Sequence, residues 1–262
     1  MKFAAQENLV PGTSFREKVE NLRKFGYEGV ELRGDGLASR VDEIRSTLNE
    51  TGITATCICG GFKFGLLFPQ KEDRLQSREE IKQLLSLAAE VGAKDGVIVV
   101  PIFGSPQLPD LTPWKTPLEM EEELLVEQLG ELAEYAGQQG TKVILEPLNR
   151  YETHYINRLE QAVHICERVK SQHMTILADF FHMSIEESDI ASSIRKASDW
   201  IGYVHLADSN RLLPGLGHTD FRSGFAALKE SGYKGWMSLE CGVPGDPAET
   251  LAASRRFMAS QL

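Results

Sequence analysis

Four ionisable residues in the second half of the chain each end, or nearly end, a short apolar run. The runs are VILE, TILAD, YVHLAD and MSLE, and they carry Glu146, Asp179, His205 and Glu240. Successive residues of this set are 33, 26 and 35 positions apart, close to one strand–helix unit each. If four parallel strands brought them to one point, three carboxylates would repel one another, and a bound cation would relieve that repulsion. The pattern therefore predicts a metal centre.

The donor types indicate which ion to expect. One imidazole nitrogen with several carboxylate oxygens suits Mn²⁺, Mg²⁺ or Co²⁺ better than an ion that prefers thiolates. We expect one divalent ion, with Mn²⁺ first and Co²⁺ or Mg²⁺ as alternatives. Any one of these residues alone could instead cap a helix or form a local ion pair, but four in register favour a metal site. Glu152, His182 and Arg211 follow these residues closely, and we expect them to hydrogen-bond substrate oxygens.

The elements that position these residues alternate between apolar runs and helical patterns. Ser14-x-x-Glu17 and Ser77-x-x-Glu80 are capping boxes that predict two of the helix starts. The 262 residues hold eight strand–helix units. Strict alternation implies parallel strands with right-handed crossovers, and eight units favour a closed barrel. No Gly-x-Gly-x-x-Gly turn supports a dinucleotide-binding sheet. We expect residues 1–262 to form one (β/α)8 TIM barrel domain of the α/β class.

Two predicted connections are longer than the rest. Residues 60–76 follow the third strand and residues 103–120 follow the fourth, at the end of a barrel where active sites are built. Both contain large aromatic side chains, namely Phe62, Phe64, Phe68 and Trp114. Two interpretations stay open: the connections act as lids over the site, or their aromatic residues pack against helices or a partner subunit.

Composition narrows the classes of partner. A formal net charge of −10 disfavours binding to nucleic acid or to an anionic membrane. No apolar run approaches the ~20 residues that span a bilayer, and the first residues, MKFAAQENLVPG, lack the apolar core of a signal peptide. The four cysteines match neither a zinc ribbon nor a disulfide framework. We expect reduced thiols and a cytoplasmic protein.

The motifs resemble those of the xylose isomerase-like barrel superfamily, and within it those of the ketose 3-epimerases that act on D-tagatose and D-psicose. The resemblance rests on VILEPLNRYETH at 143–154, Asp179-x-x-His182, His205 followed by Arg211, and Glu240. It implies that the four strand-end residues bind Mn²⁺ or Co²⁺. It also implies that the matching glutamates form the acid–base pair and that three further residues bind the carbonyl end of the sugar. The glutamates are Glu146 and Glu240; the three further residues are Glu152, His182 and Arg211.

The chemistry expected of such a site is proton abstraction beside a carbonyl. One glutamate removes the C3 proton of a free ketose, the ion stabilises the cis-enediolate, and the other glutamate returns a proton to the opposite face. The same site would suit an aldose–ketose isomerase, a hydroxypyruvate isomerase or an inosose dehydratase. The three substrate-binding residues favour the epimerase.

Two further functions agree less well with the sequence. An apurinic-site endonuclease shares the barrel but carries extra histidines on earlier strands, and here those strands end in CICGG and VPIFG. A sugar-binding barrel without activity would not be expected to keep every ligand. We therefore expect a small carbohydrate substrate, and, from the resemblance alone, a homodimer or homotetramer.

Overall fold

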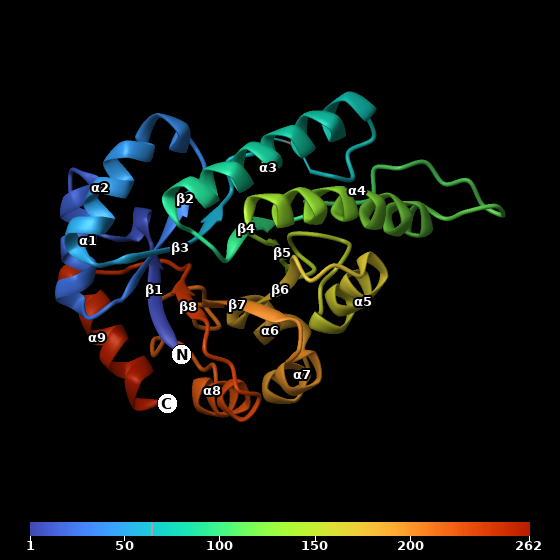
Figure 1. The fold of residues 1–262 in the computed structure, drawn as a ribbon. Helices are drawn as coiled ribbons and strands as arrows, with labels where there is room; N and C mark the ends of the chain where they lie inside the picture. Colours follow the sequence, from blue (N-terminus) through green and yellow to red (C-terminus); the bar gives the residue numbers. More distant parts are fainter. Residues whose placement is uncertain (64) are drawn as a thin grey trace.

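The strands of the protein close into a single parallel barrel (Figure 1). The computed structural model describes residues 1–63 and 65–262. Each strand pairs in parallel with the next, and β1 pairs with β8 to close the ring. The strands are β1 (Lys2–Gln6), β2 (Gly29–Arg33), β3 (Thr54–Cys59), β4 (Gly96–Val99), β5 (Val143–Leu145), β6 (Met174–Asp179), β7 (Ile201–Leu206) and β8 (Trp236–Leu239). This confirms the predicted single-domain (β/α)8 TIM barrel.

The helices surround the barrel, and most of them begin at a residue whose side chain caps the first turn. They are α1 (Phe15–Phe25), α2 (Val41–Thr51), α3 (Lys71–Val91), α4 (Pro117–Gln139), α5 (Leu159–Val169), α6 (Phe180–Glu186), α7 (Ile190–Ala197), α8 (Phe221–Glu230) and α9 (Pro247–Ser260), with short 3₁₀ turns η1 (Glu7–Leu9) and η2 (Leu37–Arg40). Ser14 caps α1 as predicted, by accepting a hydrogen bond from the backbone N–H of Glu17. The helix α6 has no counterpart among the predicted helices. No helix in the described part of the chain is long and apolar enough to cross a membrane.

Side chains alternate along the strands between two apolar clusters, one inside the barrel and one between the strands and the helices. The interior cluster consists of Ala4, Cys57, Cys59, Ile98, Ile144, Leu177, Tyr203 and Trp236. Because side chains on a strand repeat every two residues, the residue two positions beyond an inward-facing one also faces inward. Gln6, Glu146, Asp179 and His205 each stand two positions beyond a member of this cluster. The strand pleat therefore aims all four into the barrel mouth.

The connection after β3 is shorter than predicted. The helix α3 begins at Lys71, so the connection that we expected to span 60–76 ends at residue 70. Ser77 lies buried inside α3 and does not cap its start, so the second predicted capping box is wrong. The reason is visible in the first turn, where Glu72 and Asp73 favour a helix start through the helix dipole. Phe64 of this connection lies outside the described residues.

The connection after β4 also ends earlier than predicted. The helix α4 begins at Pro117, so the connection expected at 103–120 ends at residue 116. Thr116 and Glu119 form a capping box with proline at the first helical position, a combination that fixes a helix start. Figure 1 shows this connection, in green, extending beyond the ring of helices. We call residues 100–116 the arm.

Candidate metal centre and substrate cavity

The four strand-end residues predicted as metal ligands meet at the barrel mouth. Ligand atoms of Glu146, Asp179, His205 and Glu240 all lie within 4.8 Å of one another. His205 Nδ1 lies 3.2 Å from a carboxylate oxygen of Glu240 and 3.6 Å from oxygens of Glu146 and Asp179. His205 is fully buried, and Glu146 and Asp179 are almost so. The structure thus brings together the four side chains that their spacing grouped.

The atoms that face one another at this point suit a cation. Glu146 Oε1, Asp179 Oδ2 and His205 Nδ1 are buried and make no hydrogen bond within the described residues. Buried polar atoms without a partner are rare, because leaving one unpaired costs about 1–3 kcal/mol. Here the unpaired atoms point at a common centre and are of the types that hold Mn²⁺, Mg²⁺ or Co²⁺. The residues present therefore fit a divalent ion.

The other ring nitrogen of His205 is held by a residue that the spacing pattern missed. His205 Nε2 lies 3.0 Å from Oε2 of Glu31, which is fully buried on β2. Glu31 also accepts hydrogen bonds from Tyr203 and from Gln6, whose side-chain amide bonds Glu240 as well. A carboxylate on the far nitrogen of a ligating histidine fixes its ring and tautomer. With Glu31 accepting from Nε2, Nδ1 is the ring nitrogen that faces the carboxylates of Glu146, Asp179 and Glu240.

The two glutamates have different proton affinities. Burial raises the pKa of Glu146 to about 7. Burial acts on Glu240 in the same direction, but His205 outweighs it and holds the pKa of Glu240 below its usual range. The environments of the two carboxylates therefore differ: Glu146 is the more deeply buried, and Glu240 lies 3.2 Å from His205 Nδ1.

A cavity of about 340 Å³ opens over the cluster. Its wall on the side of β5, β6 and β7 carries the three predicted substrate-binding residues, Glu152, His182 and Arg211. Arg211 Nη1 donates to Glu152 Oε1 at 2.5 Å, and the Asn149 side chain donates to the same oxygen at 2.8 Å. The structure therefore places all three at one site, next to Glu146 and Glu240.

The orientation of His182 can be derived from its neighbours. Its Nδ1 lies 3.1 Å from the backbone nitrogen of Asn149, which can only donate, so Nδ1 accepts. The proton of the neutral ring is then on Nε2. That nitrogen is buried and makes no hydrogen bond within the described residues. His182 thus presents a free N–H donor at the cavity.

The aromatic residues of the two long connections have different surroundings. Phe62 and Phe103 line the cavity. Trp114 lies in the arm and is 70% exposed, with its ring 5.1 Å from the Lys115 amine. Trp114 is therefore not buried against the helices of its own barrel. A lid role or contact with a partner subunit stays a prediction.

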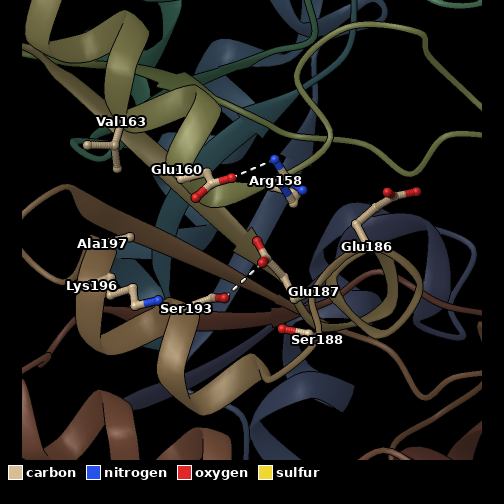
Figure 2. Close-up of a pocket in the computed structure, with 9 residues that line it drawn as sticks. All are labelled: Arg158, Glu160, Val163, Glu186, Glu187, Ser188, Ser193, Lys196 and Ala197. Carbon is tan, nitrogen blue, oxygen red and sulfur yellow. Dashed lines mark hydrogen bonds and ion pairs between the residues drawn. The ribbon is translucent and has the colours of Figure 1, made fainter.

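Another cavity, of about 360 Å³, lies outside the barrel near α5, α6 and α7 (Figure 2). Figure 2 shows Glu187 there, bound by Ser193, and Arg158 paired with Glu160. None of the strand-end residues lines it. It is separate from the metal centre.

Comparison with known proteins agrees with this fold. Residues 19–261 match the family described as xylose isomerase-like TIM barrel. The chain belongs to this family, as the resemblance implied.

Its curated relatives are sugar epimerases. The chain is 33% identical to the 3-dehydro-D-guloside 4-epimerase of Escherichia coli over 98% of this chain and 99% of the relative. It is 31% identical to the ketose 3-epimerase of Arthrobacter globiformis over 86% of this chain and 76% of the relative. Among solved structures, the apo form of 3-keto-D-glucoside 4-epimerase from E. coli superposes with a TM-score of 0.91, at 32% identity and 99% coverage of both chains. The protein is thus an enzyme of the epimerase group within the family.

Proposed function

We propose that the protein is a divalent-metal-dependent epimerase that inverts the carbon next to the ketone of a small sugar. One observation carries the proposal: Glu146, which follows β5, and Glu240, which follows β8, line the same cavity and belong to the cluster of possible metal ligands. Two carboxylates at one reacting carbon allow one to remove a proton and the other to return it on the opposite face. Which glutamate acts first depends on the configuration of the substrate.

The metal would be held by Glu146, Asp179, His205 and Glu240. We infer Mn²⁺ as the ion, with Co²⁺ or Mg²⁺ as alternatives, because the set joins one imidazole nitrogen to three carboxylates. When bound, such an ion stabilises the negative charge that develops on sugar oxygens as the proton leaves. Glu31 keeps the His205 ring in the orientation that ligation needs.

The remaining residues would orient the sugar. The free Nε2–H of His182 and the guanidinium of Arg211 donate hydrogen bonds, which suits the ketone oxygen. Glu152 can only accept, which suits a neighbouring hydroxyl group. Asn149 bonds both Glu152 and His182 and so fixes their positions relative to each other.

Two substrates use this same chemistry. The first is a free ketose inverted at C3, as in the curated ketose 3-epimerases. The second is a 3-dehydro glycoside inverted at C4, and it is favoured by the match to the E. coli 4-epimerase over nearly the full length of both chains. In each case the proton leaves a carbon adjacent to the ketone.

The test is a screen of metal-stripped protein that has been reconstituted with Mn²⁺. Free ketoses (fructose, psicose, tagatose and sorbose) and methyl 3-dehydro-glucoside are incubated with it, and the products are separated by chromatography. We expect a C3 or a C4 epimer that forms only in the presence of metal. Conversion to an aldose, or loss of water from the sugar, would contradict the epimerase and favour an isomerase or a dehydratase.

We also infer a homodimer or homotetramer in a reducing compartment such as the cytoplasm. The arm carries exposed Leu111 and Trp114, and Phe103 at its base is 59% exposed, which suits burial against a second copy. The four cysteines form no disulfide. Light scattering after gel filtration tests the assembly, and a Trp114→Ser variant that stayed unchanged in mass would argue against the arm as the contact.

A further inference from the structure

The β2–β3 side of the cavity carries an ion pair that the proposed proton transfer does not use. Arg33 ends β2, and Asp35 follows two positions later. Both line the cavity, with Arg33 Nη2 3.4 Å from Asp35 Oδ2. Glu152, His182 and Arg211 come from the connections after β5, β6 and β7, on the other side of the barrel. The cavity thus has two polar walls, and the proposed proton transfer uses only one of them.

The second wall is built by close packing of backbone. A Cβ on Gly34 would lie 2.2 Å from the Gly60 carbonyl oxygen, and a Cβ on Gly61 would lie 2.6 Å from Gly34 Cα. Gly60 and Gly61 both have left-handed φ angles, of 70° and 95°. The connections after β2 and β3 can therefore touch backbone to backbone, which fixes Arg33 and Asp35 at the cavity edge.

This pair lies near the proposed acid–base centre. Cys59 Sγ is 3.7 Å from Arg33 Nη1 and also 3.7 Å from Glu240 Oε1. A single side chain therefore separates the guanidinium from Glu240. A sugar with its reacting carbon beside Glu240 and its ketone toward His182 would extend its far end toward Arg33.

The chemistry of the pair selects the ligand. Arg33 supplies only hydrogen-bond donors and Asp35 only acceptors, whereas a hydroxyl group both donates and accepts. An anionic group would face Asp35 and the other carboxylates of the same cavity, Glu146, Glu152 and Glu240. At 3.4 Å the Arg33–Asp35 contact is long, and the side chains are 38% and 74% exposed, so both groups are accessible to a ligand.

We propose that Arg33 and Asp35 form a subsite for the terminal hydroxyl groups of a neutral sugar, at the end remote from the reacting ketone. The proposal rests on the keto-sugar epimerase function. Arg33 donates to these hydroxyls and Asp35 accepts from them, so the pair sets the length of sugar that the enzyme prefers.

The experiment compares sugars that differ by one hydroxymethyl group. D-fructose is paired with D-xylulose, and methyl 3-dehydro-glucoside with methyl 3-dehydro-xyloside. Binding by NMR titration and kcat/KM are measured for the Mn²⁺-loaded wild type and for Arg33→Met and Asp35→Asn. Arg16→Met, which removes an exposed arginine paired with Glu50 on the outer surface, is the matched control.

For the pair that binds, we expect each variant to weaken binding and kcat/KM for the longer sugar about tenfold or more, because a charged hydrogen-bonding group is lost. For the shorter sugar the change should stay within about threefold, and Arg16→Met should change neither. Equal losses for both sugars, no loss for the longer one, or no binding of any of the four would overturn the subsite. A selective loss of binding without any turnover by the wild type would instead uphold the subsite and contradict the epimerase function.

Discussion

The two halves of the barrel mouth are built by the same strand pleat but carry different kinds of residue. The strands β5 to β8 end in Glu146, Asp179, His205 and Glu240, whose ligand atoms converge. The strands β1 and β2 contribute Gln6, which bonds Glu240, and Glu31, which bonds His205. The other cavity-lining residues of β1 to β4 include Arg33, Cys59 and Ile98. We infer that one half performs the chemistry while the other supports it and fits the substrate.

The largest effect that this division predicts is at the glutamates of the chemical half. Glu146→Gln and Glu240→Gln should each lower kcat by about a hundredfold or more, because a positioned acid or base contributes about 10²–10⁴. Steady-state kinetics on the preferred sugar measure this, with circular dichroism to check folding. Glu230→Gln, in an exposed pair with Arg195, is the control. Full turnover by either active-site variant would break the comparison.

The next effect lies in the supporting half. Glu31→Gln should weaken metal binding by about 10- to 100-fold, because Glu31 bonds the far ring nitrogen of His205, one of the proposed ligands. Competition with a chromophoric chelator gives the affinity. Glu43→Gln, on the surface of α2, is the matched control. A Glu31→Gln variant with the same metal affinity as Glu43→Gln would show that the supporting role is wrong.

A smaller effect is expected where the two halves meet. His154 bonds the buried Glu121 of α4 through Nε2 (2.7 Å) and the Gly104 carbonyl through Nδ1 (2.8 Å), and the Gly104 N–H bonds the Glu152 carbonyl. His154→Gln should therefore loosen the Glu152 connection and lower kcat/KM about fivefold, the equivalent of one hydrogen bond. His164→Gln breaks an exposed histidine–glutamate pair and serves as the control. Equal kinetics for the two variants would contradict this link.

The smallest effect concerns the connection that carries Arg211. Burial opposes ionisation of Asp208, but backbone N–H groups of Thr219, Ser209, Gly217 and Gly215 outweigh it and hold its pKa below the usual value. A lowered pKa stabilises the fold above the unfolded pKa of ~3.9, and that stability is lost as the pH falls through the folded pKa. The difference in unfolding midpoint between wild type and Asp208→Asn should therefore shrink from about pH 6 to about pH 3. A difference that grew as the pH fell would contradict the predicted stabilisation of the fold by ionised Asp208.

The same division explains what the sequence could predict. The residues of the chemical half end apolar runs about one strand–helix unit apart, so they stand out in the sequence. The four expected ligands meet at one point, and Glu146, Glu240, Glu152, His182 and Arg211 line one cavity. Barrel closure followed from counting the units. The roles of these residues stay predictions until they are measured.

The supporting half could not be predicted in the same way. Glu31 lies between Val30 and Leu32 in β2, and the sequence gives no sign of its partner, since His205 is 174 residues away. The one available signal was that a charged side chain on a buried strand needs a polar partner. The end of the connection after β3 was misjudged because Ser77 resembled a helix cap, although the helix begins about two turns earlier.

The central claim, proton exchange at the carbon beside a ketone, is tested most directly in D₂O. The Mn²⁺-loaded protein is incubated with the sugar it converts, and NMR locates the deuterium in the product. The account predicts deuterium at the inverted carbon, appearing with the epimer and absent with metal-free protein or with Glu146→Gln. Epimer formed without deuterium at that carbon, or deuterium at C1 of an aldose, would contradict it.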